Sequence, residues 1–477
     1  MPPLNSFQKK CLAVTLSQIV SLPLQAATIS VDSSFDALDA DRCTLRAAIL
    51  SANTDTAVDS CQAGSGNDII TFDLLNNSTI TLTSGDLPTI TSNITINGPG
   101  FSNLEINGDG NSRIFSLTNY ANLSFSSMTI SNGSSISGAA IYSNTGTVTV
   151  NNSLIVGNTA FNGGAIYARS SNVTINDSIV LNNQANNHGG GVHTKESRVT
   201  INDSYLLEND ANQRGGGVYT QESVVTIDKS LVSSNSATVG GGLRSGNCTL
   251  NIVNSTVFSN TASSGGGIYT GGSDFFMTNS TVSNNYVYNS GAGLSFYRGD
   301  IEVTNSTISG NVSDDDTGGI RLVLTSSMII RNSILSGNKA RNTFNGLELH
   351  ISRGTNINVI AENNIFGDAG STNLNAFYMF VPSNNNILAT SDELNIPLNQ
   401  IIEPLVNNGG NTLIHTLPSA SPAIGAASTS ECPTTDQRGN IRDEGFFVPI
   451  VAANNNVAVV DLGGDCDIGA IEFSADD

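Results

Sequence analysis

The residues best suited to chemistry recur in a column, with one member about every 25 residues. This column reads Tyr142, Tyr167, His193, Tyr219, Arg244, Tyr269, Ser295 and Arg321. Aromatic faces pack on sugar rings, and tyrosine and arginine are favoured at interfaces, so we expect the first six residues to bind a glycan or a surface protein. The alternative is structural, because rings separated by one strand spacing of about 4.8 Å can stack on one another. A second column, two residues further along the chain, adds polar groups at Arg169, Lys195 and Gln221.

A catalytic centre that cleaves polysaccharides needs carboxylates, or a carboxylate and an arginine, converging on one face. The weak candidates for such a centre are Arg298, Asp300 and Arg321. The motif set of polygalacturonase-like hydrolases is incomplete, because its Arg-Ile-Lys element is missing from the chain. Catalysis is therefore the alternative to binding.

Metal binding has one weak candidate site in the sequence. Asp314, Asp315 and Asp316 are consecutive, and carboxylate oxygens are the ligands that Ca²⁺ prefers. A solvated acidic turn is the simpler interpretation, so we expect no cofactor and keep calcium as the alternative. His188 and His193 have no third zinc ligand near them in the sequence.

The elements that must position these columns follow from a strict internal repeat. Asparagines recur at intervals of 25 to 27 residues, at Asn158, Asn183, Asn209, Asn235, Asn260, Asn285, Asn311 and Asn338. A serine lies five residues before each of them, from Ser153 to Ser333. A fixed period of this length is typical of a solenoid, in which each repeat forms one coil. Asparagine tolerates left-handed backbone at a bend, and its amide can bond the identical amide one coil away, so we interpret this ladder as structural.

The strands of each coil follow from its apolar columns. Two columns that begin with Val148 and Val150 lie two residues apart, which is the strand period. A column that begins with Ile155 marks another strand, and a glycine-led strand that includes Ile166 presents the tyrosine column on its outward side. The sequence therefore predicts an all-β fold, a right-handed parallel β-helix with three strands per coil of about 25 residues.

Proline usage supports this fold independently. None of the twelve prolines lies between Pro99 and Pro382. Proline has no N–H to donate and is excluded from strands that are hydrogen-bonded on both sides. Seven prolines lie at or after Pro382, so the architecture is expected to change there.

Composition excludes several classes of partner. The net charge is −21, which argues against nucleic acid as a partner, and an acidic polysaccharide would need a local cluster of basic residues. No segment approaches the 18 or so apolar residues of a transmembrane helix. We expect a monomer whose partners are extracellular glycans or surface proteins.

The two ends of the chain differ from the repeats. Residues 1–26 resemble a signal peptide, with Lys9 and Lys10 before an apolar stretch and small residues at Ala26 and Ala27, so we expect export. We divide the rest into an N-terminal cap at 27–75, the β-helix at 76–375 and a C-terminal cap at 376–477. An amphipathic helix is expected within the N-terminal cap, at residues 45–52.

Five cysteines follow the predicted signal peptide. Cys43 lies near Cys61 and Cys432 near Cys466, and both pairs fall in the predicted caps. In an oxidising compartment each pair is expected to form a disulfide. Cys248 lies alone on a repeat strand and is expected to be a free thiol.

The N-terminal cap resembles a known domain. The run from Cys43 to Ile49, followed by Ala52-Asn53, Gly64, Gly66, Asp68 and Phe72, resembles the CSLREA domain of exported bacterial β-helix proteins. It departs from that pattern at Thr44 and Ala47, where the domain has serine and glutamate. The resemblance implies export to the surface or surroundings of a bacterium.

The C-terminal cap is similar to a choice-of-anchor Q domain. The similarity rests on Pro404 to Thr412, Ser421 to Gly425, Asp436 to Gly439 and Cys466 to Phe473. That family usually continues into an anchor, whereas this chain stops four residues after Phe473. The repeats also resemble those of chlamydial polymorphic outer-membrane proteins. Together these features predict a secreted or cell-surface adhesion protein that binds glycan or matrix, with a polysaccharide lyase or glycoside hydrolase as the alternative.

Overall fold

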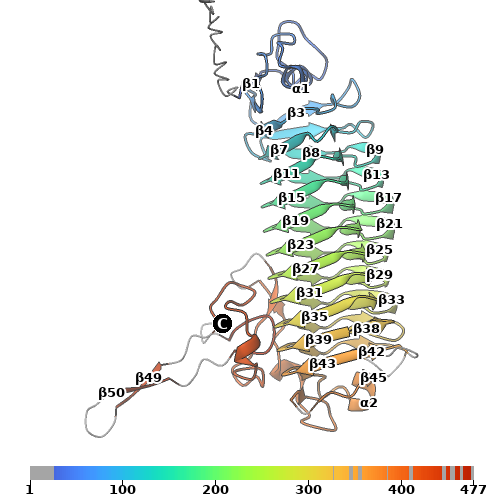
Figure 1. Cartoon of the computed structure of the whole chain (residues 1–477), viewed down its shortest axis with the longest axis vertical. Helices are drawn as coiled ribbons and strands as arrows, with labels where there is room; N and C mark the ends of the chain where they lie inside the picture. The colour runs from blue at the N-terminus through green and yellow to red at the C-terminus, as the bar shows by residue number, and fades with distance from the viewer. Residues whose placement is uncertain are drawn as a thin grey trace, which may run out of the picture.

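The computed structural model describes residues 26–473 except 326, 343–346, 353–356, 384, 408–411, 443–446, 452–456 and 462–465. The predicted signal peptide at 1–26 therefore lies almost entirely outside the described residues. The chain forms a parallel β-helix, in which short strands one coil apart pair in register and the coils stack into a long column (Figure 1). The predicted fold class is confirmed.

The first two strands of each coil belong to two long parallel sheets. Strands of the first sheet are β1 (Thr28–Val31), β2 (Asp68–Phe72), β4 (Ile94–Asn97), β7 (Asn122–Ser126), β11 (Thr147–Asn151), β15 (Asn172–Asn176), β19 (Arg198–Asn202), β23 (Val224–Asp228), β27 (Thr249–Val253), β31 (Asp274–Thr278), β35 (Asp300–Thr304), β39 (Ser327–Arg331) and β43 (Asn358–Glu362). Strands of the second sheet are β3 (Ser78–Thr81), β5 (Leu104–Asn107), β8 (Thr129–Ser131), β12 (Leu154–Val156), β16 (Ile179–Leu181), β20 (Tyr205–Leu207), β24 (Leu231–Ser233), β28 (Thr256–Phe258), β32 (Thr281–Ser283), β36 (Thr307–Ser309), β40 (Ile334–Ser336), β44 (Ile365–Phe366) and β46 (Ile387–Leu388).

Two further sheets complete the coil. Strands of the third sheet are β9 (Ser134–Ser137), β13 (Thr159–Asn162), β17 (Gln184–His188), β21 (Asp210–Arg214), β25 (Ser236–Val239), β29 (Thr261–Ser264), β33 (Tyr286–Ser290), β37 (Val312–Ser313) and β41 (Lys339–Ala340). Strands of the fourth sheet, which carries the tyrosine column, are β6 (Phe115–Leu117), β10 (Ile141–Asn144), β14 (Ile166–Arg169), β18 (Val192–Lys195), β22 (Val218–Gln221), β26 (Leu243–Gly246), β30 (Ile268–Gly271), β34 (Leu294–Tyr297), β38 (Ile320–Val323), β42 (Leu349–Ile351) and β45 (Phe377–Tyr378).

The third sheet corrects the prediction of three strands per coil, because the regular coils carry four. Its strands lie between the ladder asparagine and the glycine cluster, where sequence patterning gave no signal. In β13 the side chain of Ala160 is buried, whereas Phe161 is exposed and the flanking residues are half-buried. A strand with one small buried residue lacks the apolar alternation that identifies strands in a sequence.

A continuous apolar core fills the interior of the coils. It extends from Ile29 in β1 to Phe377 in β45, and the inward residues of the repeats, such as Ile175, Val180 and Ile166, are fully buried. Each coil therefore packs its aliphatic side chains on those of its neighbours, as stacked solenoid repeats must.

The asparagine ladder runs along the bend between the second and third sheets. Asn183 Nδ2 donates to Asn209 Oδ1 at 3.0 Å, and the Asn183 backbone N–H donates to the same oxygen at 3.1 Å. Each amide from Asn158 to Asn338 is almost fully buried and repeats this pattern. The ladder ends on a carboxyl group, because the Asn338 side-chain and backbone N–H groups both donate to Glu348. The structural role predicted for the ladder is confirmed.

Two hydroxyl ladders parallel the asparagines at other bends. The predicted serine column bonds from coil to coil, as where the Ser178 backbone N–H donates to Ser204 Oγ at 3.1 Å. A further ladder, which we had not predicted, follows the fourth sheet at Ser171, Ser197, Ser223, Cys248 and Ser273. Cys248 is the buried free thiol, and it takes the place of a serine as acceptor from the Ser223 backbone N–H.

The N-terminal end of the column is covered by α1 (Leu45–Thr54), which confirms the predicted helix (Figure 1). The Thr44 side chain caps it by accepting a hydrogen bond from the Ala47 backbone N–H at 3.2 Å. The Cys43–Cys61 disulfide joins the chain just before the helix to the loop that follows it, and the ion pair between Arg46 and the buried Asp36, at 2.8 Å, fixes the helix to the preceding loop.

The other end of the column is covered by α2 (Asn373–Ala376) and by the last strands, β45 and β46. The segment that follows carries 3₁₀ turns at Leu398–Gln400 and Thr429–Glu431, the strand pair β47 (Leu405–Val406) and β48 (Ile414–His415), and the hairpin of β49 (Phe447–Val451) and β50 (Val457–Asp461). Much of this segment lies against the side of the coils, over β28 to β40, instead of over the open end (Figure 1).

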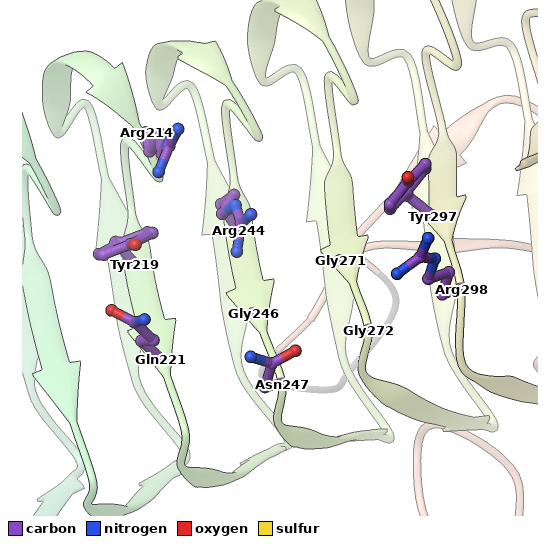
Figure 2. Close-up of a pocket in the computed structure, with 10 residues that line it drawn as sticks. All are labelled: Arg214, Tyr219, Gln221, Arg244, Gly246, Asn247, Gly271, Gly272, Tyr297 and Arg298. Carbon is purple, nitrogen blue, oxygen red and sulfur yellow. The ribbon is translucent and has the colours of Figure 1, made fainter.

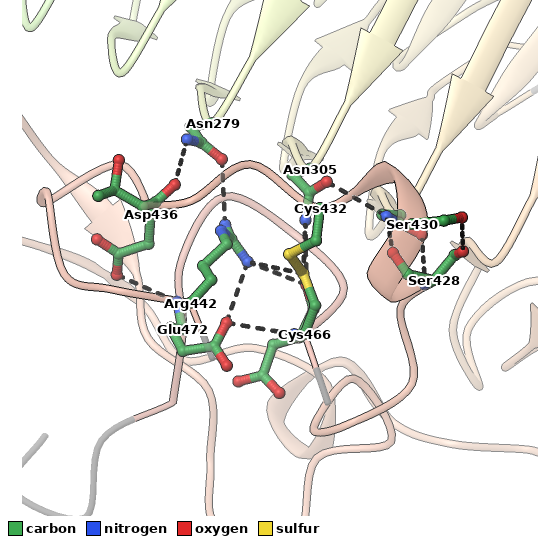
Figure 3. Close-up of a disulfide and its surroundings, with 12 residues drawn as sticks. Asn279, Asn305, Ser428, Ser430, Cys432, Asp436, Arg442, Cys466 and Glu472 are labelled. Atoms are coloured by element: carbon green, nitrogen blue, oxygen red, sulfur yellow. Dashed lines mark hydrogen bonds and ion pairs between the residues drawn. A yellow bond between two sulfur atoms is a disulfide. The ribbon is translucent and has the colours of Figure 1, made fainter. Parts of the chain in front are cut away.

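The side contact has an apolar part, in which Ile334 and Ile365 of the coils pack with Ile414 and Ile468, and a polar part around Arg442. The predicted Cys432–Cys466 disulfide, which the structure contains, links two parts of the segment to each other (Figure 3). The fully buried guanidinium of Arg442 donates to Asn279 Oδ1 at 3.3 Å and pairs with Glu472 at 3.3 Å. Asn279 belongs to a row of bend asparagines in successive coils. The segment is thus attached to the repeats partly through the side chains of their bend asparagines. Within the described ranges, no helix combines the length and the apolar character that crossing a membrane requires.

Candidate functional site

The tyrosine column lies in register on the outward side of the fourth sheet. Tyr142 pairs with Tyr167, Tyr167 with His193, and Tyr219 with Arg244. The column continues past the predicted residues, because Arg321 pairs with His350, and His350 with Tyr378. These last two members were missed because the loops between them lengthen the repeat beyond its usual period.

The first half of the column is packed against itself. The rings of Tyr142 and Tyr167 stack at 5.6 Å with planes only 6° apart. The His193 ring makes edge contacts with Tyr167 at 4.9 Å and with Tyr219 at 4.8 Å. His193 is 8% exposed and Tyr219 5%, so neither ring offers a free face to a ligand. This half matches the structural alternative for the column.

The histidines of this half are neutral near pH 7. Burial lowers the pKa of His193 to about 3, and the nearby His188 adds to this effect. Burial and the positive charges of Arg214 and Arg244 lower the pKa of His188 to about 4. The Nδ1 atoms of both rings are buried without a hydrogen-bond partner in the described structure. These rings therefore contribute packing and no positive charge.

The second half of the column opens into a hollow of about 280 Å³ (Figure 2). We call it the arginine hollow, and its lining residues are Arg214, Tyr219, Gln221, Arg244, Gly246, Asn247, Gly271, Gly272, Tyr297 and Arg298. Its cause is a gap in the second polar column, where Gly246 and Gly271 occupy the register positions between Gln221 and Tyr297. Two successive coils without a side chain leave the sheet surface bare there.

The guanidinium of Arg244 covers the floor of the arginine hollow. A Cβ atom at Gly246 would collide with its Nη1 atom, and one at Gly271 would lie 3.2 Å from its Nη2 atom. The rings of Tyr219 and Tyr269 lie on either side of the guanidinium, at 5.7 and 5.6 Å. Aromatic rings on both sides hold the guanidinium group in place by cation–π attraction.

Three arginines surround the hollow, and within the described residues none of them has a carboxylate at ion-pair distance. Arg214 ends β21, Arg244 lies on β26, and Arg298 follows β34 at a bend with φ of 64°. Arg298 lies over the Tyr297 ring at 5.2 Å. Burial lowers the pKa of Arg244, and its Nε atom is buried without a hydrogen-bond partner. Most other described arginines are paired, as Arg331 is with Glu362 at 2.9 Å.

The structure does not bring the weak catalytic candidates together. Arg298 lies in the arginine hollow, whereas Asp300 begins β35 in the first sheet and accepts from Ser327 Oγ at 2.7 Å. Arg321 lies on β38 and pairs with Asp316 at 3.7 Å. The bend between the fourth and first sheets turns Arg298 and Asp300 onto different faces of the coil.

The consecutive aspartates are held by arginines of neighbouring strands. Asp314 accepts from Arg341 at 2.9 Å and from the Tyr286 hydroxyl, and Asp316 pairs with Arg321. Among the described residues, no group of three His, Cys, Asp or Glu side chains is placed to hold a metal ion.

Comparisons with known proteins concern the fold. Residues 215–389 match the family model described as the right handed beta helix region, which gives the hand of the coils. A search of curated proteins finds no match for the chain. Two solved structures are similar over most of their lengths but only loosely superimposable. One is the pectate lyase Pel9A, at 12% identity and TM-score 0.40, covering 94% of this chain and 96% of that one. The other is a mannuronic acid specific polysaccharide family 6 lyase from human gut microbiota, at 11% identity and TM-score 0.31, covering 70% and 87%. The fold is therefore a right-handed parallel β-helix.

Proposed function

We propose that this chain is an exported glycan-binding protein that acts outside the cell or at its surface, without catalysis, through the outward face of the fourth sheet. The observation that carries the proposal is the arginine hollow, where the exposed ring of Tyr297 and guanidinium groups without an ion-pair partner among the described residues line a depression on a rigid support. Rings supply flat apolar surface for sugars, and the cations and amides supply hydrogen-bond donors and acceptors that fix orientation.

The placement of acidic groups favours binding over catalysis. No carboxylate is among the described residues that line the arginine hollow, and Glu222 beside it accepts a hydrogen bond from Gln221 at 3.3 Å. The acidic residues singled out in the sequence make other contacts, Asp300 with Ser327 and Asp316 with Arg321. Hydrolysis of a glycosidic bond generally uses two carboxyl groups that flank the bond. A lyase would need a base beside an arginine, so elimination remains the alternative that the experiment below tests.

The disulfides support export. Cys43–Cys61 and Cys432–Cys466 are both formed in the structure, and structural disulfides persist in oxidising compartments. The resemblances to the CSLREA and choice-of-anchor Q domains, and to the repeats of chlamydial outer-membrane proteins, belong to the same proposal. We propose further that the protein binds as a monomer and without calcium, so that a chelator leaves binding unchanged.

The test is a panel of polysaccharides assayed for binding by affinity electrophoresis and for release of reducing ends or unsaturated products. We expect at least one polymer to bind without product release, and the double variant Tyr269→Ala/Tyr297→Ala to lose that binding. Tyr288→Ala is the matched control, because Tyr288 is 58% exposed on the third sheet. Absence of binding to every polymer, or product release that Arg298→Gln abolishes, would overturn the proposal.

A further inference from the structure

We propose that the arginine hollow recognises the carboxylate groups of an acidic polysaccharide. This inference rests on the proposed glycan-binding function and specifies the chemical class of the ligand. The overall composition alone would predict the opposite, since the chain carries 40 acidic and 19 basic residues and repels polyanions over most of its surface. A local excess of cations in such a chain has to have a cause.

The structure provides no internal partner for this local charge. Eight other arginines of the described chain have a carboxylate at ion-pair distance, at Arg46, Arg113, Arg169, Arg321, Arg331, Arg341, Arg438 and Arg442. Within the described residues the exposed Arg42 and Arg198 have none, but each stands apart from the hollow. Arg214, Arg244 and Arg298 gather at one hollow, and none has such a partner among the described residues. Arg214 and Arg298 are exposed, whereas Arg244 is half-buried and has lost hydration without a compensating anion, which an anionic ligand would supply.

The geometry of Arg244 suits a carboxylate in particular. Its guanidinium group lies between the rings of Tyr219 and Tyr269, at 5.7 and 5.6 Å, so cation–π attraction holds it in place before a ligand arrives. A planar guanidinium donates two parallel N–H bonds to a carboxylate, which a lysine cannot do. The glycines at 246 and 271 leave the space that this guanidinium occupies within the hollow.

The spacing of the three arginines suits a polymer. Arg214 lies one coil before Arg244, and Arg298 lies two coils after it along the fourth sheet. Because successive coils are about 4.8 Å apart, the three cations span about 14 Å along the axis of the β-helix. A chain of charged sugars laid along this axis meets them in succession, with Gln221 and Tyr297 beside it.

The experiment compares an acidic polymer with its own methyl ester, which shares its backbone, and with a sulfated polymer of a different backbone. Binding of the full chain to polygalacturonate, to the same polymer after methyl esterification and to a sulfated dextran is measured at two salt concentrations. We expect polygalacturonate to bind in a salt-dependent manner, and its methyl ester and the sulfated polymer to bind at least about tenfold more weakly. Arg244→Gln and Arg298→Gln should each weaken binding of polygalacturonate about tenfold, and Arg244→Lys should restore only part of it. Arg42→Gln, which removes one exposed charge in the N-terminal cap, should leave binding unchanged.

The outcomes separate this inference from the proposed function. Equal binding of the acid and its methyl ester, with loss of both in Tyr269→Ala/Tyr297→Ala, would overturn the carboxylate assignment while the glycan-binding face stands. Binding of the sulfated polymer that equals or exceeds that of polygalacturonate would also overturn it. A thermal melt of each variant identifies any loss of binding that is caused by unfolding.

Discussion

The asparagine ladder and the arginine hollow are both built from residues of successive coils, yet their chemistry is opposite. In the ladder each buried amide donates to the amide of the next coil, as Asn209 does to Asn235 at 3.0 Å. In the hollow the side chains differ from coil to coil. The guanidinium of Arg244 has no carboxylate at ion-pair distance among the described residues. Identical self-complementary groups consume their own hydrogen-bonding capacity, whereas varied groups leave it available to a ligand.

This difference separates stability from function along the same solenoid. Changes in the ladder should reduce the stability of the fold and leave the affinity of each folded molecule intact. Changes in the hollow should reduce the affinity for the ligand and leave the stability of the fold intact.

Asn235→Ala should lower the free energy of unfolding by about 4 kcal/mol, because it leaves the Asn209 amide and backbone N–H groups and the Leu206 carbonyl buried without partners. Chemical denaturation measures this loss. Asn212→Ala is the control, since that side chain is exposed on β21 and its removal should change little. Equal losses in the two variants would show that the ladder does not stabilise the fold.

The carboxyl group at the end of the ladder should make stability depend on pH. Burial raises the pKa of Glu348 to about 8, so between its unfolded pKa of 4.5 and about 8 the folded chain holds a proton that the unfolded chain releases. The contribution of Glu348 to stability should therefore fall by about 2–3 kcal/mol as the pH rises from 5 to 7. Glu348→Gln should remove this contribution, so the stability at pH 5 relative to that at pH 7 should be about 2–3 kcal/mol lower in the variant than in the unsubstituted protein. Denaturation curves at the two pH values measure this, and an unchanged difference between pH 5 and pH 7 would contradict the assignment.

His193 should act in the opposite direction. Its folded pKa of about 3 lies below the unfolded value of 6.5, so stability is present above pH 6.5 and is lost as the pH falls toward 3. From pH 7 to pH 5 the contribution of His193 should fall by about 2 kcal/mol, opposite in sign to that of Glu348, and His193→Gln should remove this share. Denaturation curves of both proteins at pH 7 and pH 5 provide the comparison. Because His193 belongs to the self-stacked half of the face, glycan affinity should not change in this pH range.

Filling the arginine hollow should weaken binding without changing charge. Gly246→Ala places a methyl group against Arg244 and should reduce affinity for the bound polysaccharide about tenfold, or about 1.4 kcal/mol. Gly271→Ala makes a looser contact with the same guanidinium and should have a smaller effect. Affinity electrophoresis ranks the two variants, and a larger effect at Gly271 would mean that Arg244 is not the group displaced.

The repeat itself made much of the fold predictable. Asn183 and Asn209 are identical and regularly spaced, and their spacing alone places one above the other. Ala160 gave no such signal, so the third sheet was missed. The side contact of Arg442 with Asn279 joins positions 163 residues apart and has no period to reveal it.

The candidate site was predictable only in part. The tyrosine column was found because its members keep the period, but the burial of Tyr219 depends on neighbouring rings that a sequence does not place. The hollow depends on two glycines, Gly246 and Gly271. Their role becomes clear only when the strand register places them between Gln221 and Tyr297. The lack of an anion beside Arg244 is a property of the folded surface.

The most direct test of the account is hydroxyl-radical footprinting of the full chain with and without a polysaccharide that binds it. If the polysaccharide binds on the fourth sheet, Tyr269 and Tyr297 should be oxidised more slowly in the complex. Phe276 on the first sheet and Tyr288 on the third, which are 39% and 58% exposed, should be oxidised at an unchanged rate. Protection of Phe276 or Tyr288 while Tyr269 and Tyr297 stay fully reactive would contradict the placement of the binding site on the fourth sheet.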